Sequence, residues 1–242
     1  ASTPGPPDEI GDALGAHFLH WTSSYHDRDW PELSADDRNV ALRQIAELEA
    51  ALLELSEFPV GRGVRSVAVM KNVGRSVGGS LTHGHQQIAL TNVAPRRFKE
   101  NARFLQRRGE TFSSFLIREN PKPLTVADLD GGPLIVPYFM PRPFDMHFLL
   151  SNTAPNYLHE LTEKELAGLA EAIALGMEVT RAVLLSLGKE VAYNILIHTG
   201  PGAGIYVEFL PRSQENGGFE QLGFSACQGV PAEAARILRE LL

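Results

Sequence analysis

Two histidines and a glutamine at alternate positions, His83, His85 and Gln87, form the part of the sequence best suited to chemistry. Side chains two residues apart in a β-strand share a face, so a strand from Leu81 to Leu90 would point these three the same way. Imidazole is nucleophilic at neutral pH, and its phosphoramidate passes a phosphoryl group onward. A nearby amide can donate to phosphoryl oxygens. The alternative is a structural His-x-His pair on a solvent-facing strand.

A glycine-rich segment from Asn72 to Ser80 comes directly before these residues. It contains three glycines, two serines and an arginine. Glycine lets backbone amides approach an anion closely, and such turns bind phosphates. Many glycine-rich loops only connect strands, so the segment indicates a phosphate site because of its position beside the histidines.

The elements that must position these residues occur twice along the chain. Each copy begins with an apolar strand and continues with a polar stretch and a capping box, at Ser34 and Asp37 in the first copy and at Thr162 and Glu165 in the second. Apolar residues at helical spacing follow each cap and predict a buried helix face, which in the first copy begins with Val40 and Ala41. The expected strands cover residues 16–21, 66–70 and 81–90 in the first copy, and 133–139, 146–150, 192–198 and 205–210 in the second.

This repeated order predicts an α+β fold of two duplicated units, with mostly antiparallel sheets flanked by helices. We expect residues 1–14 to be a flexible lead-in. Residues 15–130 are expected to form the first unit, which carries the histidine site, and residues 131–242 a second unit without the catalytic histidines.

Composition narrows the class of protein. The chain has 242 residues, of which 43% are hydrophobic and 21% charged, as in ordinary globular enzymes. No apolar run reaches the roughly 20 residues of a membrane span, and the first residues lack a secretory signal pattern. Cys227 is the single cysteine, which excludes an intrachain disulfide and favours a cytoplasmic setting.

Charge indicates which partners to expect. The formal net charge of −7 argues against broad nucleic-acid binding. A local basic cluster is expected to be a solvated helix face, with a substrate-steering patch as the alternative. It consists of Arg96, Arg97, Arg103, Arg107 and Arg108.

Residues 70–74, 78–80 and 83–87 together resemble the active-site segment of galactose-1-phosphate uridylyltransferases. That family belongs to the histidine-triad (HIT) superfamily, alongside nucleoside polyphosphate phosphorylases and sugar-nucleotide phosphorylases. The resemblance extends from about residue 15 to the end of the chain, through Tyr193-Asn194 and the segment from His198 to Pro201. It implies that both units are HIT-like and that the protein is a homodimer.

The resemblance also implies roles for single residues. His85 would be the nucleophile that takes a nucleoside monophosphate from a nucleotide or nucleotide-sugar donor, and a phosphorylated acceptor such as a sugar 1-phosphate would then collect it. Gln87 would hold the phosphoryl oxygens, and His83 would support His85. The phosphate-binding positions would be Asn72, Gly78, Gly79 and Ser80. No cofactor is expected.

Metal sites of the family do not carry over to this sequence. The family's zinc site pairs histidines that match His26 and His83 with two upstream cysteines, and no cysteine precedes these residues here. A structural zinc site wants four ligands, so no metal is expected and the histidines should be hydrogen-bonded structural residues. A second metal site in some members uses a histidine matching His198 and a His-x-His in the last strand, which here contains no histidine. His198 is therefore expected in a loop or lining a pocket.

Two other functions fit the same residues. A phosphorylase or hydrolase would keep the covalent step on His85 but send the nucleotide to phosphate or water. A non-catalytic relative would keep the phosphate cradle and bind nucleotides without turnover. Gln87 favours the transferase, because the hydrolytic members place another histidine at its position.

Overall fold

The computed structural model describes residues 14–55 and 65–242, so nearly all of the lead-in expected over residues 1–14 lies outside the described residues. In the described part, eight strands form one antiparallel sheet in the order β1-β3-β2-β7-β8-β6-β5-β4. The strands are β1 (Gly15–Trp21), β2 (Ser66–Val73), β3 (His85–Thr91), β4 (Thr125–Leu129), β5 (Gly132–Ile135), β6 (Met146–Leu149), β7 (Tyr193–His198) and β8 (Tyr206–Pro211).

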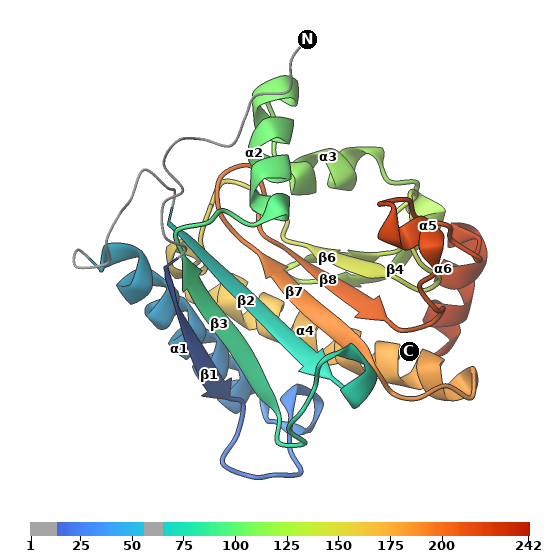
Figure 1. Ribbon diagram of the computed structural model, residues 1–242, viewed down its shortest axis with the longest axis horizontal. Helices are drawn as coiled ribbons and strands as arrows, with labels where there is room; N and C mark the ends of the chain where they lie inside the picture. The colour runs from blue at the N-terminus through green and yellow to red at the C-terminus, as the bar shows by residue number, and fades with distance from the viewer. Residues whose placement is uncertain (1–13, 56–64) are drawn as a thin grey trace.

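Helices cover the sheet unequally. The long helices α1 and α4 lie together behind the sheet in Figure 1, whereas α2 and α3 lie towards the other side near β6 and β8. The helices of the described chain are α1 (Ala35–Glu54), α2 (Arg96–Arg108), α3 (Phe112–Glu119), α4 (Glu163–Ser186), α5 (Gly218–Gln221) and α6 (Pro231–Glu240). None of the helices in this part of the chain is long and apolar enough to cross a membrane.

Local sequence signals set where the two long helices begin. The Ser34 hydroxyl accepts a hydrogen bond from the Asp37 amide, and Thr162 and Glu165 form a reciprocal capping box. Both helices were predicted from these caps, which satisfy amide groups that have no partner within a helix. The predicted α+β fold with an antiparallel sheet and flanking helices is confirmed.

The sheet order has an internal symmetry. The three strands β1-β3-β2 and the three strands β6-β8-β7 have the same connectivity, and they meet at the pairing of β2 with β7. A short 3-10 helix precedes both α1 and α4, at Trp30–Glu32 and Leu158–Glu160. This arrangement supports the expected duplication. The division of the chain at residue 130 stays a prediction.

The two faces of the sheet differ in composition. One face packs Val69, Ile88, Ile195 and Phe209 into a continuous core with the long helices. The opposite face, which we call the open face, carries His85 and Gln87 in the first half of the sheet, because residues two apart in a strand share a face. In the second half, α3 covers part of the open face through a small separate core around Leu116 and Tyr206.

Three predicted details are wrong. The strand expected over residues 81–90 begins only at His85, so His83 lies in the loop before β3. The strand expected over residues 133–139 ends at Ile135, and Pro137 follows, which has no amide hydrogen for a sheet ladder. Val40 was expected on the buried stripe of α1 but is 49% exposed, and Leu42 is buried instead.

Candidate functional site

His85 is the first residue of β3, and its ring is oriented by the backbone. Its side chain is almost fully buried, with 4% of the residue exposed, and its Nδ1 lies 2.8 Å from the carbonyl oxygen of His83. A carbonyl oxygen only accepts, so Nδ1 carries the hydrogen and donates it. Nε2 then holds the free lone pair, and it has no hydrogen-bond partner among the described residues. This tautomer leaves Nε2 as the nucleophilic nitrogen of the ring.

His83 supports His85 through its backbone. Its own ring donates elsewhere: Nε2 lies 2.7 Å from the carbonyl oxygen of Ser23. The ring also packs against Trp21 and His26, with centroid separations of 4.6 and 4.4 Å. The three side chains predicted to share a strand face therefore reduce to two, because only His85 and Gln87 belong to the strand.

Gln87 lies beside His85 on the open face. It pairs with Leu19 of β1 on one side and Met70 of β2 on the other. Its side-chain amide makes no hydrogen bond within the described chain. The amide is therefore available to a ligand that reaches along the open face from His85.

The glycine-rich loop is folded by its own amides. Gly78 donates to the carbonyl of Arg75 at 3.2 Å and Gly79 donates to that of Gly74 at 2.9 Å, so both amides are already used within the loop. A Cβ atom at Gly79 would lie 2.8 Å from the Gly74 oxygen, which explains why glycine is needed there. Both amides thus have partners within the loop, and the phosphate-binding role of Gly78 and Gly79 stays a prediction.

Side chains of the loop remain free for an anion. The Asn72 oxygen accepts a hydrogen bond from Asn194 of β7 at 2.8 Å, and this bond leaves the Asn72 NH2 group as a donor. Ser80 and Arg75 form no side-chain hydrogen bond within the described residues. The sequence singled out Asn72 and Ser80. No individual role was predicted for Arg75, which belongs to the glycine-rich segment, or for Asn194, which belongs to a segment that carries the resemblance.

A buried ion pair between Lys71 and Asp29 contacts the backbone at the start of β3. Lys71 Nζ lies 2.7 Å from the Asp29 carboxylate and 3.1 Å from the His85 carbonyl oxygen. Burial lowers the pKa of Lys71, and the charge of Asp29 opposes that shift. Gly84 packs directly on Asp29, where a Cβ atom would lie 2.6 Å from the carboxyl carbon. The ion pair was not predicted from the sequence, because only tertiary folding brings Asp29 and Lys71 together.

Two adjoining cavities surround these residues. The smaller has a volume of about 230 Å³ and is lined by His85, His83, Asn72, Arg75 and Ser80 among others. The larger has a volume of about 530 Å³ and is lined by residues in and before the 3-10 helix Trp30–Glu32 and by residues of α4. They share lining residues Asp29, Val73, Thr82 and Gly84. Gln87 lines neither cavity.

The residues near His83 do not fit a zinc centre. His26 contacts His83 ring to ring, and His83 Nε2 is engaged with a backbone carbonyl. Within residues 14–55 and 65–242, no group of three or more histidine, cysteine, aspartate or glutamate side chains could hold a metal ion. Two imidazoles alone fall short of the four ligands of a structural site.

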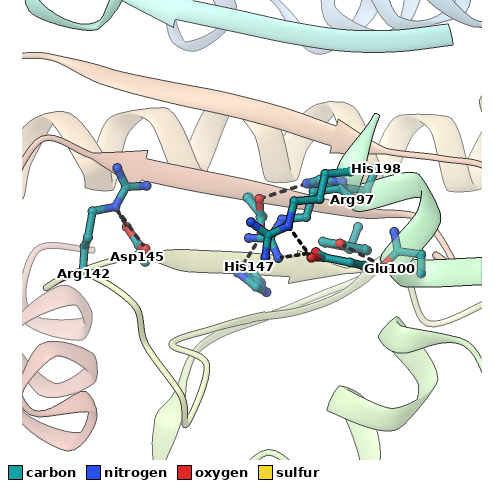
Figure 2. Close-up of polar contacts among 10 residues, drawn as sticks. Arg97, Glu100, Arg142, Asp145, His147 and His198 are labelled. Carbon is teal, nitrogen blue, oxygen red and sulfur yellow. Dashed lines mark hydrogen bonds and ion pairs between the residues drawn. The ribbon is translucent and has the colours of Figure 1, made fainter. Parts of the chain in front are cut away.

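A second polar cluster lies on the open face in the other half of the sheet. Glu208 of β8 accepts from His198 Nε2 at 2.9 Å and lies 3.4 Å from both His147 Nε2 and Arg97. Burial alone would raise the pKa of Glu208, but the hydrogen bond from His198 and the charges around it hold that pKa well below its usual range. Tyr206 stacks on His198 at 4.3 Å. Figure 2 shows this cluster beside the Arg142–Asp145 pair.

Only part of this second cluster was predicted from the sequence. His198 was expected in a loop or pocket lining, yet it is the last residue of β7 and is buried. The basic residues of α2 are exposed, as a solvated helix face predicts, but Arg97 also reaches the buried Glu208. The signal that could have found the cluster is the charged Glu208 in an otherwise apolar strand.

Among known proteins, no protein-family model and no curated protein matches the chain. Solved structures do match. One described as a uridylyltransferase has 20% sequence identity and a TM-score of 0.81, with 99% of this chain and 82% of that chain covered. An ADP-glucose phosphorylase from Arabidopsis thaliana, solved with bound ADP-glucose, has 18% identity and a TM-score of 0.78, with 94% and 74% covered.

A third match is a GalT-like protein from Arabidopsis thaliana, with 19% identity, a TM-score of 0.78, and 94% and 75% of the two chains covered. Identities in this range establish shared architecture, and function must be argued from the site. The chain therefore has the same fold as these uridylyltransferase, GalT-like and ADP-glucose phosphorylase structures, as the resemblance implied.

Proposed function

We propose that this protein is a nucleotidyltransferase that moves a nucleoside monophosphate through a covalent intermediate on His85. The observation that carries the proposal is the tautomer of His85, which lines a cavity: its Nδ1 donates to the His83 carbonyl, and its Nε2 has no partner among the described residues. The donor is a nucleotide or nucleotide-sugar, and the acceptor is a phosphorylated small molecule such as a sugar 1-phosphate. Neighbours of the same fold include a uridylyltransferase and an ADP-glucose phosphorylase, which supports this substrate class.

The reaction proceeds in two displacements. His85 Nε2 attacks the α-phosphorus of the donor, a P–N bond forms, and the P–O bond to the leaving phosphate breaks. The ring gains positive charge, which strengthens the hydrogen bond from Nδ1 to the His83 carbonyl. An oxygen of the acceptor phosphate then attacks the same phosphorus, the P–N bond breaks, and His85 returns to its starting state.

The surroundings of His85 supply charge stabilisation for this transfer. Arg75 and the NH2 group of Asn72 line the same cavity and have unused donors, and Ser80 adds a hydroxyl. Gln87 lies two residues after His85 on the same face of β3 and donates hydrogen bonds from its side-chain amide to the phosphoryl oxygens. The adjoining cavity of about 530 Å³ has room for the remainder of a donor molecule.

An intact-mass experiment tests the covalent step. The protein is incubated with UDP-glucose or ADP-glucose, without an acceptor, and its mass is measured by electrospray. We expect a mass increase of one nucleoside monophosphate, which His85→Ala abolishes and the matched control His17→Ala, at an exposed histidine of β1, retains. Absence of an adduct with a panel of nucleotide-sugars and dinucleoside polyphosphates, in protein shown to be folded, would refute the proposal.

A second stage of the same experiment separates transferase from phosphorylase or hydrolase. The isolated adduct is divided among sugar 1-phosphate, orthophosphate and buffer alone. Nucleotide-sugar formation supports the transferase, nucleoside diphosphate formation supports the phosphorylase, and free nucleoside monophosphate supports the hydrolase. Ligand binding without any adduct would support the non-catalytic relative.

The assembly and setting of the protein belong to the same proposal. Exposed apolar side chains on the edge strand β1, Leu19 and Trp21, are consistent with a homodimer. Light scattering measures the mass, and a monomer mass would contradict this part. A cytoplasmic setting stays a prediction from the single cysteine.

A further inference from the structure

A cavity of about 520 Å³ opens beside the second polar cluster, away from His85. Its lining includes Arg97, Arg142, Asp145, His147 and Glu208. It shares no lining residue with either cavity near His85. The cavity is therefore a separate place on the open face, beside residues of β6 and β8 that have no role in the proposed transfer.

Two guanidinium groups at this cavity have unused hydrogen-bond donors. Arg142 contacts Asp145 only through Nε, at 3.5 Å, and its terminal nitrogens have no partner in the described chain. Arg97 contacts Glu208 at 3.4 Å and Glu100 at 3.5 Å, and about half of its side chain is exposed. These contacts are long for charge-assisted hydrogen bonds, which are usually 2.7–2.9 Å. Both arginines can therefore donate to an added anion.

Two buried side chains at the same cavity have an unpaired polar atom. Asp145 is 0% and His147 2% exposed, and neither Asp145 Oδ1 nor His147 Nδ1 has a hydrogen-bond partner. Burial raises the pKa of Asp145 to about 7 and lowers that of His147 to about 4. His147 is thus neutral at pH 7, and the Asp145 carboxyl group titrates there. Such groups pair with the hydroxyl groups of a ligand, which both donate and accept.

The backbone is strained where it holds this cluster. Phe144, directly before Asp145, has a φ of 68°, and Ile205, directly before Tyr206, has a φ of 45°. A β-branched residue rarely adopts positive φ, and strained residues concentrate at ligand sites.

We propose that this cavity is a second, non-covalent binding site for a small polyol or sugar that carries one anionic group, a phosphate or a carboxylate. The anionic group lies between Arg97 and Arg142, and hydroxyl groups pair with Asp145 Oδ1 and His147 Nδ1. Binding here is independent of His85, so the inference goes beyond the proposed transfer.

Calorimetric titration of the full chain tests the site with four probes: glucose 6-phosphate, gluconate, glucose and inorganic phosphate. We expect at least one anionic sugar to bind at least about tenfold more tightly than glucose or inorganic phosphate, since each of these lacks half of the recognised chemistry. Comparing glucose 6-phosphate with gluconate decides between phosphate and carboxylate.

Variants locate the binding. Arg142→Gln should weaken the preferred probe at least about tenfold, because a charge-assisted hydrogen bond is lost. His85→Ala should leave the affinity unchanged. Arg97→Gln, at a more exposed position, replaces Arg142→Gln if the latter has a lowered unfolding temperature. Hydrogen exchange should show ligand protection in residues 141–148 and not in residues 72–85.

Three results would overturn the inference. One is that no probe binds to the wild type at about 10 mM. Another is binding that His85→Ala abolishes and Arg142→Gln leaves intact, which would place the ligand at the first site. The last is equal affinity for inorganic phosphate and glucose 6-phosphate, which would remove the polyol from the proposal.

Discussion

The two halves of the sheet place different residues at equivalent positions. Gln87 of β3 pairs with Met70 and Leu19, and Glu208 of β8 pairs with Leu196 and His147 in the corresponding registers. Two residues earlier, where the first half has His85, the second half has Tyr206. The same strand arrangement therefore presents an amide beside an imidazole in one half and a carboxylate beside a phenol ring in the other.

The difference shows how a neighbour decides what a histidine can do. His85 is held through Nδ1 by a backbone carbonyl, so Nε2 is free. His198 uses Nε2 in its contact with Glu208 and stacks on Tyr206. The two rings are therefore held through opposite nitrogens, and only His85 keeps Nε2 without a partner among the described residues.

The largest expected effect is on catalysis at His85. We expect His85→Ala to lower kcat/KM for nucleotidyl transfer at least about 10⁴-fold, because the nucleophile is removed. His198→Ala should keep kcat/KM within about tenfold of the wild type, since that ring lies in the other half. Steady-state transfer with a nucleotide-sugar donor measures both. Equal losses in the two variants would mean that the halves do not differ as described.

The next effect compares the equivalent positions 87 and 208. Glu208→Ala leaves His198 and Arg97 without their buried partner and should lower the free energy of unfolding by about 3–5 kcal/mol. Gln87→Ala removes a side chain without internal hydrogen bonds and should cost under about 0.5 kcal/mol of stability, while lowering kcat/KM about 10²-fold. Urea unfolding and transfer kinetics separate the two outcomes. A large stability loss in the Gln87 variant would contradict the comparison.

The third effect is a pH dependence in the second half. The folded-state pKa of Asp145 is raised by burial to about 7 from 3.8, so its stabilising contribution is present below pH 3.8 and is lost as the pH rises through 7. Relative to the wild type, Asp145→Asn should gain about 2 kcal/mol of unfolding free energy between pH 5 and 7. Urea titrations at several pH values measure the difference. Asp128→Asn, at an exposed position of β4, serves as the control and should give a flat difference.

The smallest effect concerns the contact between the halves at the site. Asn194→Ala removes the donor that holds the Asn72 oxygen and the Val77 carbonyl. We expect a loss of about tenfold in kcat/KM, with the His85 adduct still formed, because Asn72 keeps its position in β2 but loses its fixed orientation. Single-turnover kinetics check this. A wild-type rate would show that Asn72 needs no support from β7.

Local signals predicted the fold well. The caps at Ser34 and Thr162 mark their helices because a side chain and an amide three residues apart suffice for them. Strand β4 was missed, and it pairs with β5 across an irregular register. His83 was placed in a strand because alternation continues through it, whereas Gly84 packs on the distant Asp29 and the strand begins only afterwards.

The candidate site was predicted where its residues are neighbours in sequence. The segment from Asn72 to Gln87 contains the proposed nucleophile His85, the glycine-rich loop and the start of β3, so one stretch of sequence was enough to predict the site. The second cluster joins Arg97, His147, His198 and Glu208 from one helix and three strands. No spacing rule links these residues, and only the pairing of β6, β7 and β8 brings them together.

The pairing of β2 with β7 has a consequence for how the protein is made. Asn72 and Asn194, which meet there, are 122 residues apart in the chain. Closing a loop of that length costs about 4 kcal/mol of chain entropy, so this pairing forms late in folding. During synthesis the ribosome releases His85 and its glycine-rich loop well before β7 exists. The growing chain therefore carries the proposed nucleophile for many residues before Asn194 is present to orient Asn72.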